Sequence, residues 1–412
     1  MTDQNSGLTL RNLPHKKILI LAINYFPEVT GCAPYSTDLA AGLVARGHSV
    51  TVVSAFPHYP AWQVQEEYRE KQSFIEYING VGVVRVRSYI PPKMNALTRG
   101  LFEFDFMVKA YSAARKLKFD SILSVSPSVS AIVVGARLAK KRGVPFKILV
   151  QDLMAAASVQ SGIKGGKLVS RIVGALEGSS LRAADSVGVI TTAFLQRTLD
   201  FGVPESRIVV TPNYSQGHVT PVDGTAARAR YGWSAEDLVV MHTGNMGLKQ
   251  DLETLVADFR ELEKVAPAVR LKLVGDGSQR EELERLAAGL SNVEFLGLVP
   301  SEEYSGLLAA ADVLIVHESP GQIDMSVPSK ITSYVAARKP MVVCSPDGGA
   351  TQLATSSYPG TRWVNAENRT ALRTMLAELS ADKSVLNSDE LVAWVDEGDA
   401  RNRELRMQWV LS

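Results

Sequence analysis

One loop of the sequence concentrates the residue types that bind phosphate. The segment His242–Asp251, HTGNMGLKQD, carries Gly244, Gly247 and Lys249 between an apolar run and a helical pattern. Glycines at such a turn let backbone N–H groups approach an anion, and a lysine adds positive charge. The alternative is a flexible turn with a surface lysine. Because both glycines and the cation fall in one short loop, we favour a phosphate cradle.

A second candidate for phosphate chemistry lies in the segment Asp324–Val343, DMSVPSKITSYVAARKPMVV. Pro328 cannot continue a strand, and Ser329 can cap the helix that follows. Lys330 then falls in the first helical turn, where the helix dipole disfavours a cation unless both address the same anion. We therefore predict a diphosphate beside Lys330. The alternative is a solvated lysine next to a capping serine.

Two further glycines follow strand-like runs and give weaker signals. Gly31, in NYFPEVTGCAP, either approaches a phosphate or sugar closely or is an ordinary turn glycine. Gly275, in LVGDG, either admits the edge of a base or ribose or makes a plain turn. The chain has no G-x-G-x-x-G fingerprint, which disfavours a dehydrogenase, and it has neither a P-loop lysine nor a G-x-S-x-G motif.

The composition disfavours metal, disulfide and nucleic-acid chemistry. There is no D-x-D pair, the usual clamp for a metal-bound sugar nucleotide, and no Cys/His cluster with zinc spacing. Cys32 and Cys344 cannot build a disulfide framework and fit a reducing compartment. We expect His242, at a strand end, to be a packed histidine rather than a base. A formal net charge of +1 gives no basic field for nucleic acid.

Alternating strands and helices must position these loops. Lys16–Asn24 opens a series of apolar runs separated by helical patterns such as Tyr35–Arg46, and a second series opens with DLVVMHTGN. This alternation predicts an α/β protein whose parallel sheets carry helices on both faces. Doubly wound domains bind ligands at the carboxyl ends of their strands, so we expect the site in a cleft between the two halves.

The 412 residues suit two domains. We predict a flexible N-terminus at 1–15, a Rossmann-like domain at 16–213, a second at 214–387 and a terminal helix at 388–412 that is broken at Gly398. The start of the chain lacks a signal-peptide core, and no stretch approaches the roughly 18 apolar residues that span a bilayer. A cytoplasmic location is therefore expected, with the inner face of the membrane as the alternative.

The segment 93–118 predicts a helix that suits the headgroup region of an anionic membrane. It combines apolar residues with bases: Leu101, Phe102, Phe104, Phe106, Met107 and Val108 with Lys93, Arg99, Lys109, Arg115, Lys116 and Lys118. The alternative is that the aromatic side chains pack on the sheet and the bases are merely solvated. Glu103 and Asp105, inside the apolar run, count against deep insertion.

The order of these segments resembles the GT-B glycosyltransferases of family 4 (group 1), and within them the colanic-acid and exopolysaccharide branch. The matching segments include KILILAINYFPEVTGCAP, VQDLMAAASVQSG, TGNMGLKQDLETL, LVGDGSQREEL and VPSKITSYVAARKPMVV. The tail helix is similar to the family's C-terminal crossover. The resemblance implies two Rossmann-like domains facing each other across a cleft. It also implies retaining transfer, without metal or cofactor, from a UDP- or GDP-linked sugar to a glycan or polyprenyl-linked acceptor.

The resemblance further implies roles for single residues. The C-terminal domain would bind the donor and the N-terminal domain the acceptor. Lys249 and Lys330 would hold the diphosphate, with Gly244, Asn245 and Gly247 as backbone donors. Asp152 and Asp324 would be the catalytic residues, with Asp324 near the sugar hydroxyls. The remaining donor-binding positions would be Gly31, Gly275, Ser329 and Ser333.

Several positions depart from the family pattern. Ser333 stands where many members have the ribose-binding Glu of an E-x7-E pattern, and Met325 stands at its first position. Gln151 replaces a common histidine, and Asn245 replaces a common arginine. These changes weaken the expected ribose contact and catalytic base and leave a nucleotide-sugar-binding pseudoenzyme open. A sugar-nucleotide 2-epimerase, which resembles the same architecture, is the other alternative.

Overall fold

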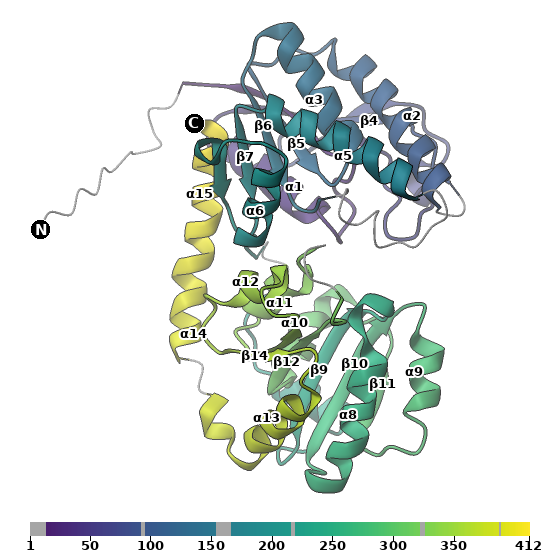
Figure 1. Ribbon diagram of the computed structural model, residues 1–412, viewed down its shortest axis with the longest axis vertical. Coiled ribbons are helices and arrows are strands. Elements are labelled where there is room, and N and C mark those ends of the chain that lie inside the picture. The colour runs from purple at the N-terminus through teal and green to yellow at the C-terminus, as the bar shows by residue number, and fades with distance from the viewer. Residues whose placement is uncertain (1–13, 92–94, 154–165, 216–218, 322–325, 387–388) are drawn as a thin grey trace, which may run out of the picture. The chain divides into compact units, whose positions relative to one another are not determined.

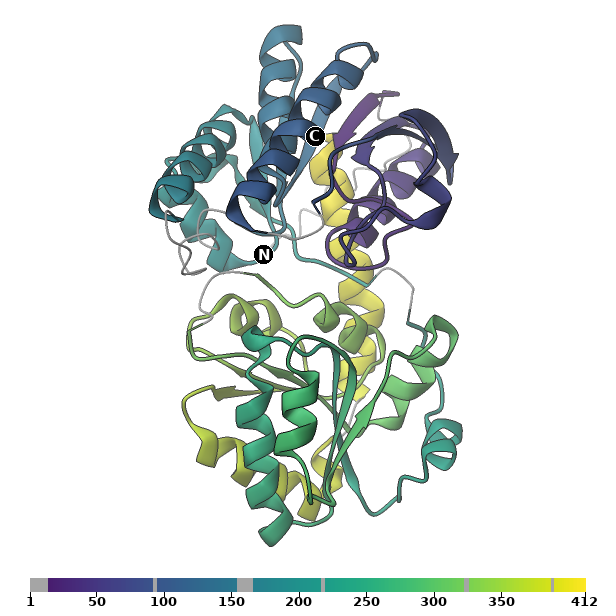
Figure 2. The same cartoon turned by 90° about the vertical axis from the view of Figure 1, so that its right-hand side faces the viewer.

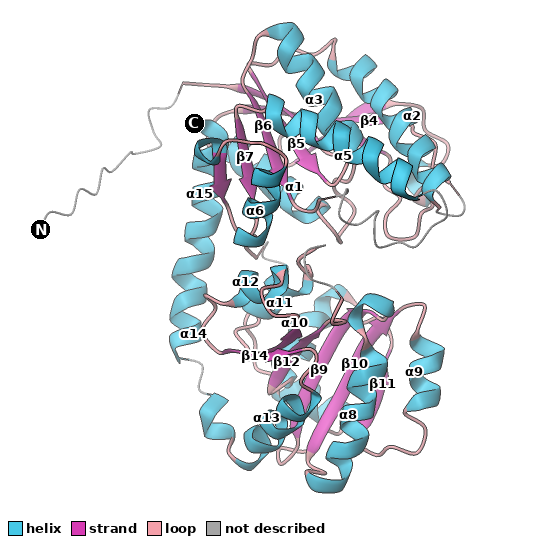
Figure 3. Ribbon diagram, in the orientation of Figure 1, coloured by secondary structure: helices cyan, strands magenta, loops and turns pink. Residues whose placement is uncertain are grey.

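The computed structural model describes residues 14–91, 95–153, 166–215, 219–321, 326–386 and 389–412. The chain forms two compact α/β units (Figure 1). Unit 1 comprises Met1–Val189, Thr198–Val209 and Met407–Ser412, and unit 2 comprises Ile190–Arg197 and Val210–Arg406. Each unit has one sheet of its own with helices packed against it (Figure 3).

The sheet of unit 1 has eight strands in the order β3-β4-β2-β1-β5-β6-β7-β8. Their bounds are β1 Lys17–Leu21, β2 Ser49–Ala55, β3 Phe74–Ile78, β4 Val81–Val86, β5 Ser121–Ser126, β6 Phe146–Val150, β7 Ser186–Val189 and β8 Ile208–Val210. The central pairs from β4 to β7 run parallel, as the apolar runs predict.

The edge strand β3 departs from the expectation of a purely parallel sheet. It pairs antiparallel with β4, with Phe74 opposite Arg85, and its residues alternate between half-buried and exposed. The turn that joins the two strands is Asn79-Gly80, and both residues have positive φ, 51° and 78°. An Asn-Gly pair between two strand-like runs is a strong hairpin signal, so the sequence does carry the information for this strand.

The helices of unit 1 begin and end at recognisable residues. Their bounds are α1 Ala33–Ala45, α2 Ala96–Ala114, α3 Val129–Arg142 and α5 Gly166–Ala183, and α6 Thr192–Asp200 is shared with unit 2. The Ser128 hydroxyl accepts from the Ala131 N–H at the start of α3, and Gly143 ends that helix in the left-handed region. Helices α2 and α3 lie side by side (Figures 1 and 2).

The sheet of unit 2 has six strands in the order β11-β10-β9-β12-β13-β14, and every neighbouring pair is parallel. The strand bounds are β9 Leu238–Asn245, β10 Val269–Asp276, β11 Val293–Leu296, β12 Val313–His317, β13 Met341–Ser345 and β14 Thr361–Asn365. The helix bounds are α7 Thr225–Tyr231, α8 Leu252–Val265, α9 Arg280–Leu286, α10 Ser301–Ala310, α11 Lys330–Ala336, α12 Ala350–Thr355, α13 Arg369–Ala381, α14 Asp389–Trp394 and α15 Ala400–Leu411.

Both faces of the unit 2 sheet are buried. Along β9, Leu238 and Val240 belong to the apolar cluster under α8 and α13, whereas Val239 and Met241 belong to the cluster under α10 and α11. Side chains of a strand alternate between faces, so a strand covered on both sides is apolar throughout. This explains why DLVVMHTGN reads as a continuous apolar run.

The terminal helix is not broken at Gly398, contrary to the sequence-based expectation. Helices α14 and α15 are joined by a single π-helical turn, Val395–Asp399, which takes up one extra residue per turn. A Cβ at Gly398 would lie 3.1 Å from the Trp394 ring, so the glycine admits that ring instead of ending the helix. In unit 1, Trp409 Nε1 donates to Ser186 Oγ at 2.8 Å and fixes the end of α15. Along the described residues, no helix is both long and apolar enough to cross a membrane.

Candidate active site

The glycines predicted to bind the donor stand at the carboxyl ends of β9 and β10. Gly244 and Gly275 are register partners, and their φ angles are 103° and 131°. A Cβ at Gly275 would lie 2.1 Å from the Gly244 carbonyl oxygen. The two strands therefore approach too closely here for any side chain at position 275.

The loop after β9 is held by its own polar groups. The Gly247 N–H donates to Gln250 Oε1 at 3.0 Å, and the Asn245 amide donates to the same oxygen at 3.3 Å. Lys249 lies exposed in the next turn, where its carbonyl accepts from Ser319 N at 3.1 Å. Of the predicted backbone donors, Gly247 is thus already engaged by a side chain, which a phosphate would have to displace.

Lys330 is the first residue of α11, and its ammonium points at β9. Its Nζ lies 2.9 Å from His242 Nε2. A Cβ built on Gly244 would lie 3.9 Å from Lys330 Nζ. Burial lowers the pKa of His242 well below its ordinary value, and the charge of Lys330 lowers it further. His242 is therefore a neutral imidazole that accepts a hydrogen bond from Lys330.

The pKa values of Lys330 and of the nearby Glu318 both lie close to 7. Burial lowers the pKa of Lys330 to about 7, although the nearby Glu318 carboxylate opposes the shift. Burial raises the pKa of Glu318 to about 7, opposed by a hydrogen bond from Thr351 and by the charges of Lys330 and Lys249. Thr351 Oγ1 donates to Glu318 Oε1 at 2.9 Å. An acid and a base that both titrate near pH 7 are typical of functional sites.

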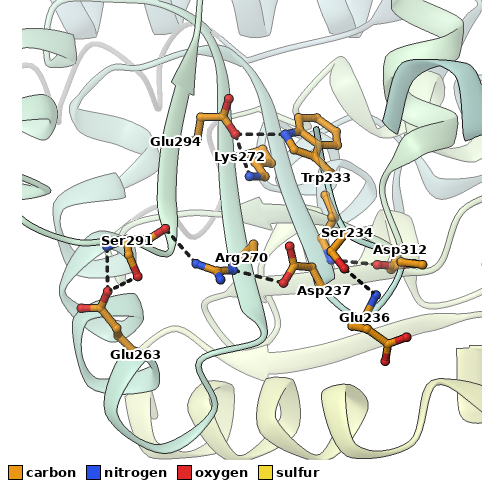
Figure 4. Close-up of polar contacts among 12 residues, drawn as sticks. Trp233, Ser234, Glu236, Asp237, Glu263, Arg270, Lys272, Ser291, Glu294 and Asp312 are labelled. Atoms are coloured by element: carbon orange, nitrogen blue, oxygen red, sulfur yellow. Dashed lines mark hydrogen bonds and ion pairs between the residues drawn. The ribbon is translucent and has the colours of Figure 1, made fainter. Parts of the chain in front are cut away.

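Lys272, on strand β10 of unit 2, shows what a structural cation looks like (Figure 4). Lys272 Nζ lies 2.6 Å from Glu294 Oε2, and Trp233 Nε1 donates to that oxygen at 3.0 Å. Lys272 thus has a carboxylate partner and an aromatic ring beside it, 4.9 Å away. Lys330, by contrast, is hydrogen-bonded to a neutral ring. An anion bound beside it would therefore gain a charge-assisted hydrogen bond.

The serines around α11 do not all behave as predicted. Ser329 occupies the N-cap position of α11, but its side chain makes no capping hydrogen bond, so the expected cap is wrong. Ser333 follows Lys330 by one helical turn, and its hydroxyl is hydrogen-bonded to the Tyr304 hydroxyl. The same tyrosine hydroxyl lies 2.9 Å from Thr243 Oγ1. Ser333 therefore lies on the Lys330 side of α11, close to the end of β9.

In unit 1, a buried carboxylate joins the loops that follow β1 and β2. Glu28 Oε1 accepts from the backbone N–H groups of His58 and Tyr59 at 2.7 and 2.8 Å. Its other oxygen accepts from Asn24 Nδ2 at 2.8 Å. Gly31 has φ 65°, and a Cβ there would lie 3.4 Å from the Tyr59 ring. Gly31 thus sits against Tyr59, within a loop that Glu28 holds in place.

Asp152 follows β6 and belongs to the same edge of unit 1. Burial raises the pKa of the Cys32 thiol to about 12, and the negative charges of Asp152 and Glu28 add to the shift. Burial, Cys32 and Asp152 likewise raise the pKa of Tyr59. The structure therefore brings Gly31, Tyr59 and Asp152 together. The other predicted catalytic residue, Asp324, lies outside the described residues.

Comparison with known proteins identifies the family. Residues 30–214 match the glycosyl transferase 4-like domain, and residues 237–382 match the glycosyl transferases group 1. The chain is 31% identical over 334 residues to the putative colanic acid biosynthesis glycosyl transferase WcaI of Escherichia coli, which covers 78% of this chain and 81% of that protein. The chain belongs to the group 1 glycosyltransferases of family 4.

Solved structures agree on the fold of this glycosyltransferase. Sucrose-phosphate synthase of Thermosynechococcus elongatus superposes with a TM-score of 0.69 at 19% identity, over 97% of this chain and 95% of that one. Anabaena HepE, in complex with UDP and glucose, gives a TM-score of 0.69 at 16% identity, over 97% and 100% of the two chains. The predicted GT-B fold is confirmed.

The contacts of three residues, His242 and Glu318 in unit 2 and Glu28 in unit 1, were not predicted. His242 was expected to be a packed histidine, and it is buried, but it also accepts the hydrogen bond of Lys330. Glu318 follows β12 in VHES, where an acid directly after a buried strand is the signal that could have found it. Glu28 lies within the quoted NYFPEVTGCAP loop, and its role depends on contacts with a loop about thirty residues away. Among the described residues, no cluster of acidic, His or Cys side chains could hold a metal ion.

Proposed function

We propose that this glycosyltransferase moves a sugar, with retention at the anomeric carbon and without a metal ion, from a UDP- or GDP-linked donor. The observation that carries the proposal is the ammonium of Lys330, which lies beside Gly244 and is hydrogen-bonded to a neutral imidazole. A diphosphate at this point would supply the missing negative charge. Anabaena HepE, which has the same fold, is solved in complex with UDP and glucose.

In this proposal, unit 2 binds the donor. Lys330 and Lys249 stabilise the charge that develops on the leaving diphosphate, the part that a metal ion plays in other transferases. Gly244 and Asn245 contribute the backbone at the end of β9, and Gly247 does so once Gln250 releases its N–H. Ser333 contacts the ribose, and Ser329 and Gly275 are the remaining proposed donor-binding positions. Asp324 addresses the sugar hydroxyls.

Unit 1 would bind the acceptor, a glycan or a polyprenyl-linked glycan of exopolysaccharide biosynthesis. Support comes from the identity to a putative colanic acid biosynthesis glycosyl transferase. Asp152 is the proposed catalytic carboxylate of unit 1, and Tyr59 lies near it with an exposed ring that can pack on a sugar. Gly31 approaches the phosphate or the sugar. The enzyme would act on the cytoplasmic side of the membrane.

The test begins with thermal unfolding in the presence of UDP, GDP and their common sugars. A ligand present at about 100 times its dissociation constant stabilises the native state by about 2.7 kcal/mol, which is easily measured. The preferred donor is then incubated with and without acceptor preparations. Transfer that needs an acceptor supports the proposal. Epimerisation of the donor without acceptor indicates a 2-epimerase, and binding without turnover for any acceptor indicates a pseudoenzyme.

A further inference from the structure

Helix α2 of unit 1 carries an exposed apolar stripe. Its four side chains follow one another at intervals of three or four residues, and such residues share one helix face. They are Leu97, Leu101, Phe104 and Val108, whose exposed fractions are 74%, 50%, 61% and 51%. Phe102 and Phe106 point the other way and are buried in unit 1. Of the aromatic residues that the sequence assigned to a membrane face, only Phe104 therefore belongs to this stripe.

The two acids of α2 are both held by polar partners within the protein. Asp105 Oδ2 accepts from the Tyr89 N–H at 2.6 Å and from Lys109 Nζ at 2.9 Å. Glu103 lies 2.9 Å from Arg99 Nη2 and accepts from Ser130 N at 3.1 Å. Both carboxylates are thus paired within the protein, which lowers the cost of bringing this helix face to a lipid surface.

A cluster of bases continues the stripe toward the carboxyl end of α2. The last turns of α2 and α3 meet where Arg142 Nη2 donates to the Arg115 carbonyl at 2.7 Å. Arg115 follows Val108 by two helical turns and so continues the same face. The basic cluster consists of Arg115, Lys116, Lys118, Lys140, Lys141 and Arg142, all of them exposed. None of the six forms a salt bridge with another residue that the structure describes.

We propose that the α2 stripe and the basic cluster together dock unit 1 on an anionic lipid surface. Leu, Val and Phe side chains can enter the boundary between headgroups and acyl chains, while lysines and arginines beside them bind anionic headgroups. A second copy of the chain fits this face less well. A two-fold contact would bring the basic cluster of one copy against the same residues of the other.

The inner side of α2 connects this face to the acceptor loop. The Phe102 ring lies 5.1 Å from the His58 ring and 5.8 Å from the Trp62 ring, and both belong to the loop that carries Tyr59. Docking through α2 would hold that loop next to the lipid surface, where a polyprenyl-linked acceptor resides. This last step rests on the proposed function, whereas the docking itself does not.

The experiment is co-sedimentation of the full chain with vesicles of phosphatidylcholine alone and of phosphatidylcholine with phosphatidylglycerol. Binding is measured at about 0.1 M and about 1 M NaCl, where the Debye length falls from about 10 Å to about 3 Å. The stripe variant is L101E/F104E, and its control is Val265→Glu, at an exposed apolar residue of unit 2. The cluster variant is R115E/K140E, and its control is R207E/R401E, which changes the net charge equally at exposed sites.

We expect the wild-type protein to bind the anionic vesicles at low salt and to be released at high salt. Both test variants should lose at least about tenfold in partitioning, and both controls should bind like the wild type. Circular dichroism and thermal unfolding confirm that each variant is folded. Wild-type protein that stays in the supernatant at low salt overturns the proposal, as do test variants that bind like their controls. A dimer that L101E/F104E dissociates would also overturn it, because the stripe would then be a self-association surface. Nucleotide-sugar turnover is not part of the readout, so docking and the proposed function can fail independently.

Discussion

The ammonium of Lys330 lies 2.9 Å from His242 Nε2, and the imidazole is held neutral by burial and by that same ammonium. The cation therefore stands at the end of β9 with a neutral partner. A charge-assisted hydrogen bond to a phosphate is about twice as strong as a bond between neutral groups. A diphosphate bound at this pair, as proposed, would therefore gain a charge-assisted hydrogen bond from Lys330.

Replacing Lys330 by alanine should weaken nucleoside diphosphate binding by about tenfold or more. A contact of this kind contributes about 1.5–3 kcal/mol, and 1.4 kcal/mol corresponds to a factor of ten. The free energy of unfolding without ligand should not fall, because the variant removes a half-buried cation whose pKa is lowered in the folded protein. Isothermal titration calorimetry with UDP and GDP measures the dissociation constants, with Lys264→Ala as the control at an exposed lysine. An unchanged dissociation constant would remove Lys330 from the site.

Diphosphate binding should weaken as the pH rises above about 7. Burial lowers the pKa of Lys330 to about 7 in the free protein, so the side chain loses its charge above that pH. A bound diphosphate favours the charged form and raises this pKa, so binding takes up a proton and affinity falls by up to about tenfold per pH unit. Calorimetry at pH 8 in buffers of different ionisation enthalpy measures the uptake.

Glu318 titrates in the same range and provides the control for this pH effect. Its pKa is raised to about 7, and an anion beside it would raise the value further, again with proton uptake. Glu318→Gln should remove the share of the uptake that comes from the carboxyl. The share from Lys330 should not decrease, because loss of the carboxylate lowers the pKa of Lys330 further in the free protein. If Lys330→Met shows the same uptake as the wild type, the pH dependence does not come from Lys330.

The fold could be predicted largely because the sequences of buried parallel strands are continuous apolar runs, as in β9. Strand β3 could not be found that way, since one of its faces is exposed and only the Asn79-Gly80 turn marks it. The helix break predicted at Gly398 was wrong. The chain continues there through a π-helical turn, and the glycine leaves room for the Trp394 ring.

Part of the candidate site could be proposed from the sequence. Glycines after a strand signal phosphate chemistry at Gly244, and a lysine in the first turn of a helix signals it at Lys330. The hydrogen bond between Lys330 and His242 joins residues 88 positions apart, and no local pattern encodes it. The same holds for Glu28, whose partners lie on another loop. For Gly275 the structure gives another reason for a glycine, because close packing of the two strands by itself requires one there.

Transfer activity should persist in excess EDTA. The motivation is the absence of any D-x-D pair in the sequence, together with two lysines that can balance the charge of the leaving diphosphate. The rate is measured with the preferred donor after dialysis against EDTA, and then with manganese or magnesium restored. Activity that is lost on chelation and regained with either metal would contradict a metal-independent mechanism.

Gly275→Ala should destabilise unit 2 by about 1–3 kcal/mol and impair donor binding. A Cβ would come within 2.1 Å of the Gly244 carbonyl oxygen, and φ of 131° is strained for any residue with a side chain. The β9–β10 pair must then move apart beneath the proposed diphosphate. Gly297→Ala is the control, because nothing lies within 4 Å of its added Cβ. Equal unfolding free energies for the two variants, measured in urea, would show that the strands are not tightly constrained at Gly275.

Glu28→Ala should destabilise unit 1 while leaving donor binding intact. The substitution leaves the N–H groups of His58 and Tyr59 without their acceptor, and each unsatisfied buried group costs about 1–3 kcal/mol. Glu28→Gln keeps one carbonyl oxygen for these two donors and should cost less. Glu66→Ala, at an exposed glutamate, should cost little. Urea unfolding gives the free energies, and calorimetry with the nucleoside diphosphate gives its affinity.

The order Ala below Gln below wild type in stability, with one dissociation constant for all, is expected if Glu28 organises the loops of unit 1 and the donor binds to unit 2. A Glu28→Ala variant as stable as wild type would mean that these loops are held by other contacts. A loss of nucleotide affinity would mean that Glu28 affects the donor site.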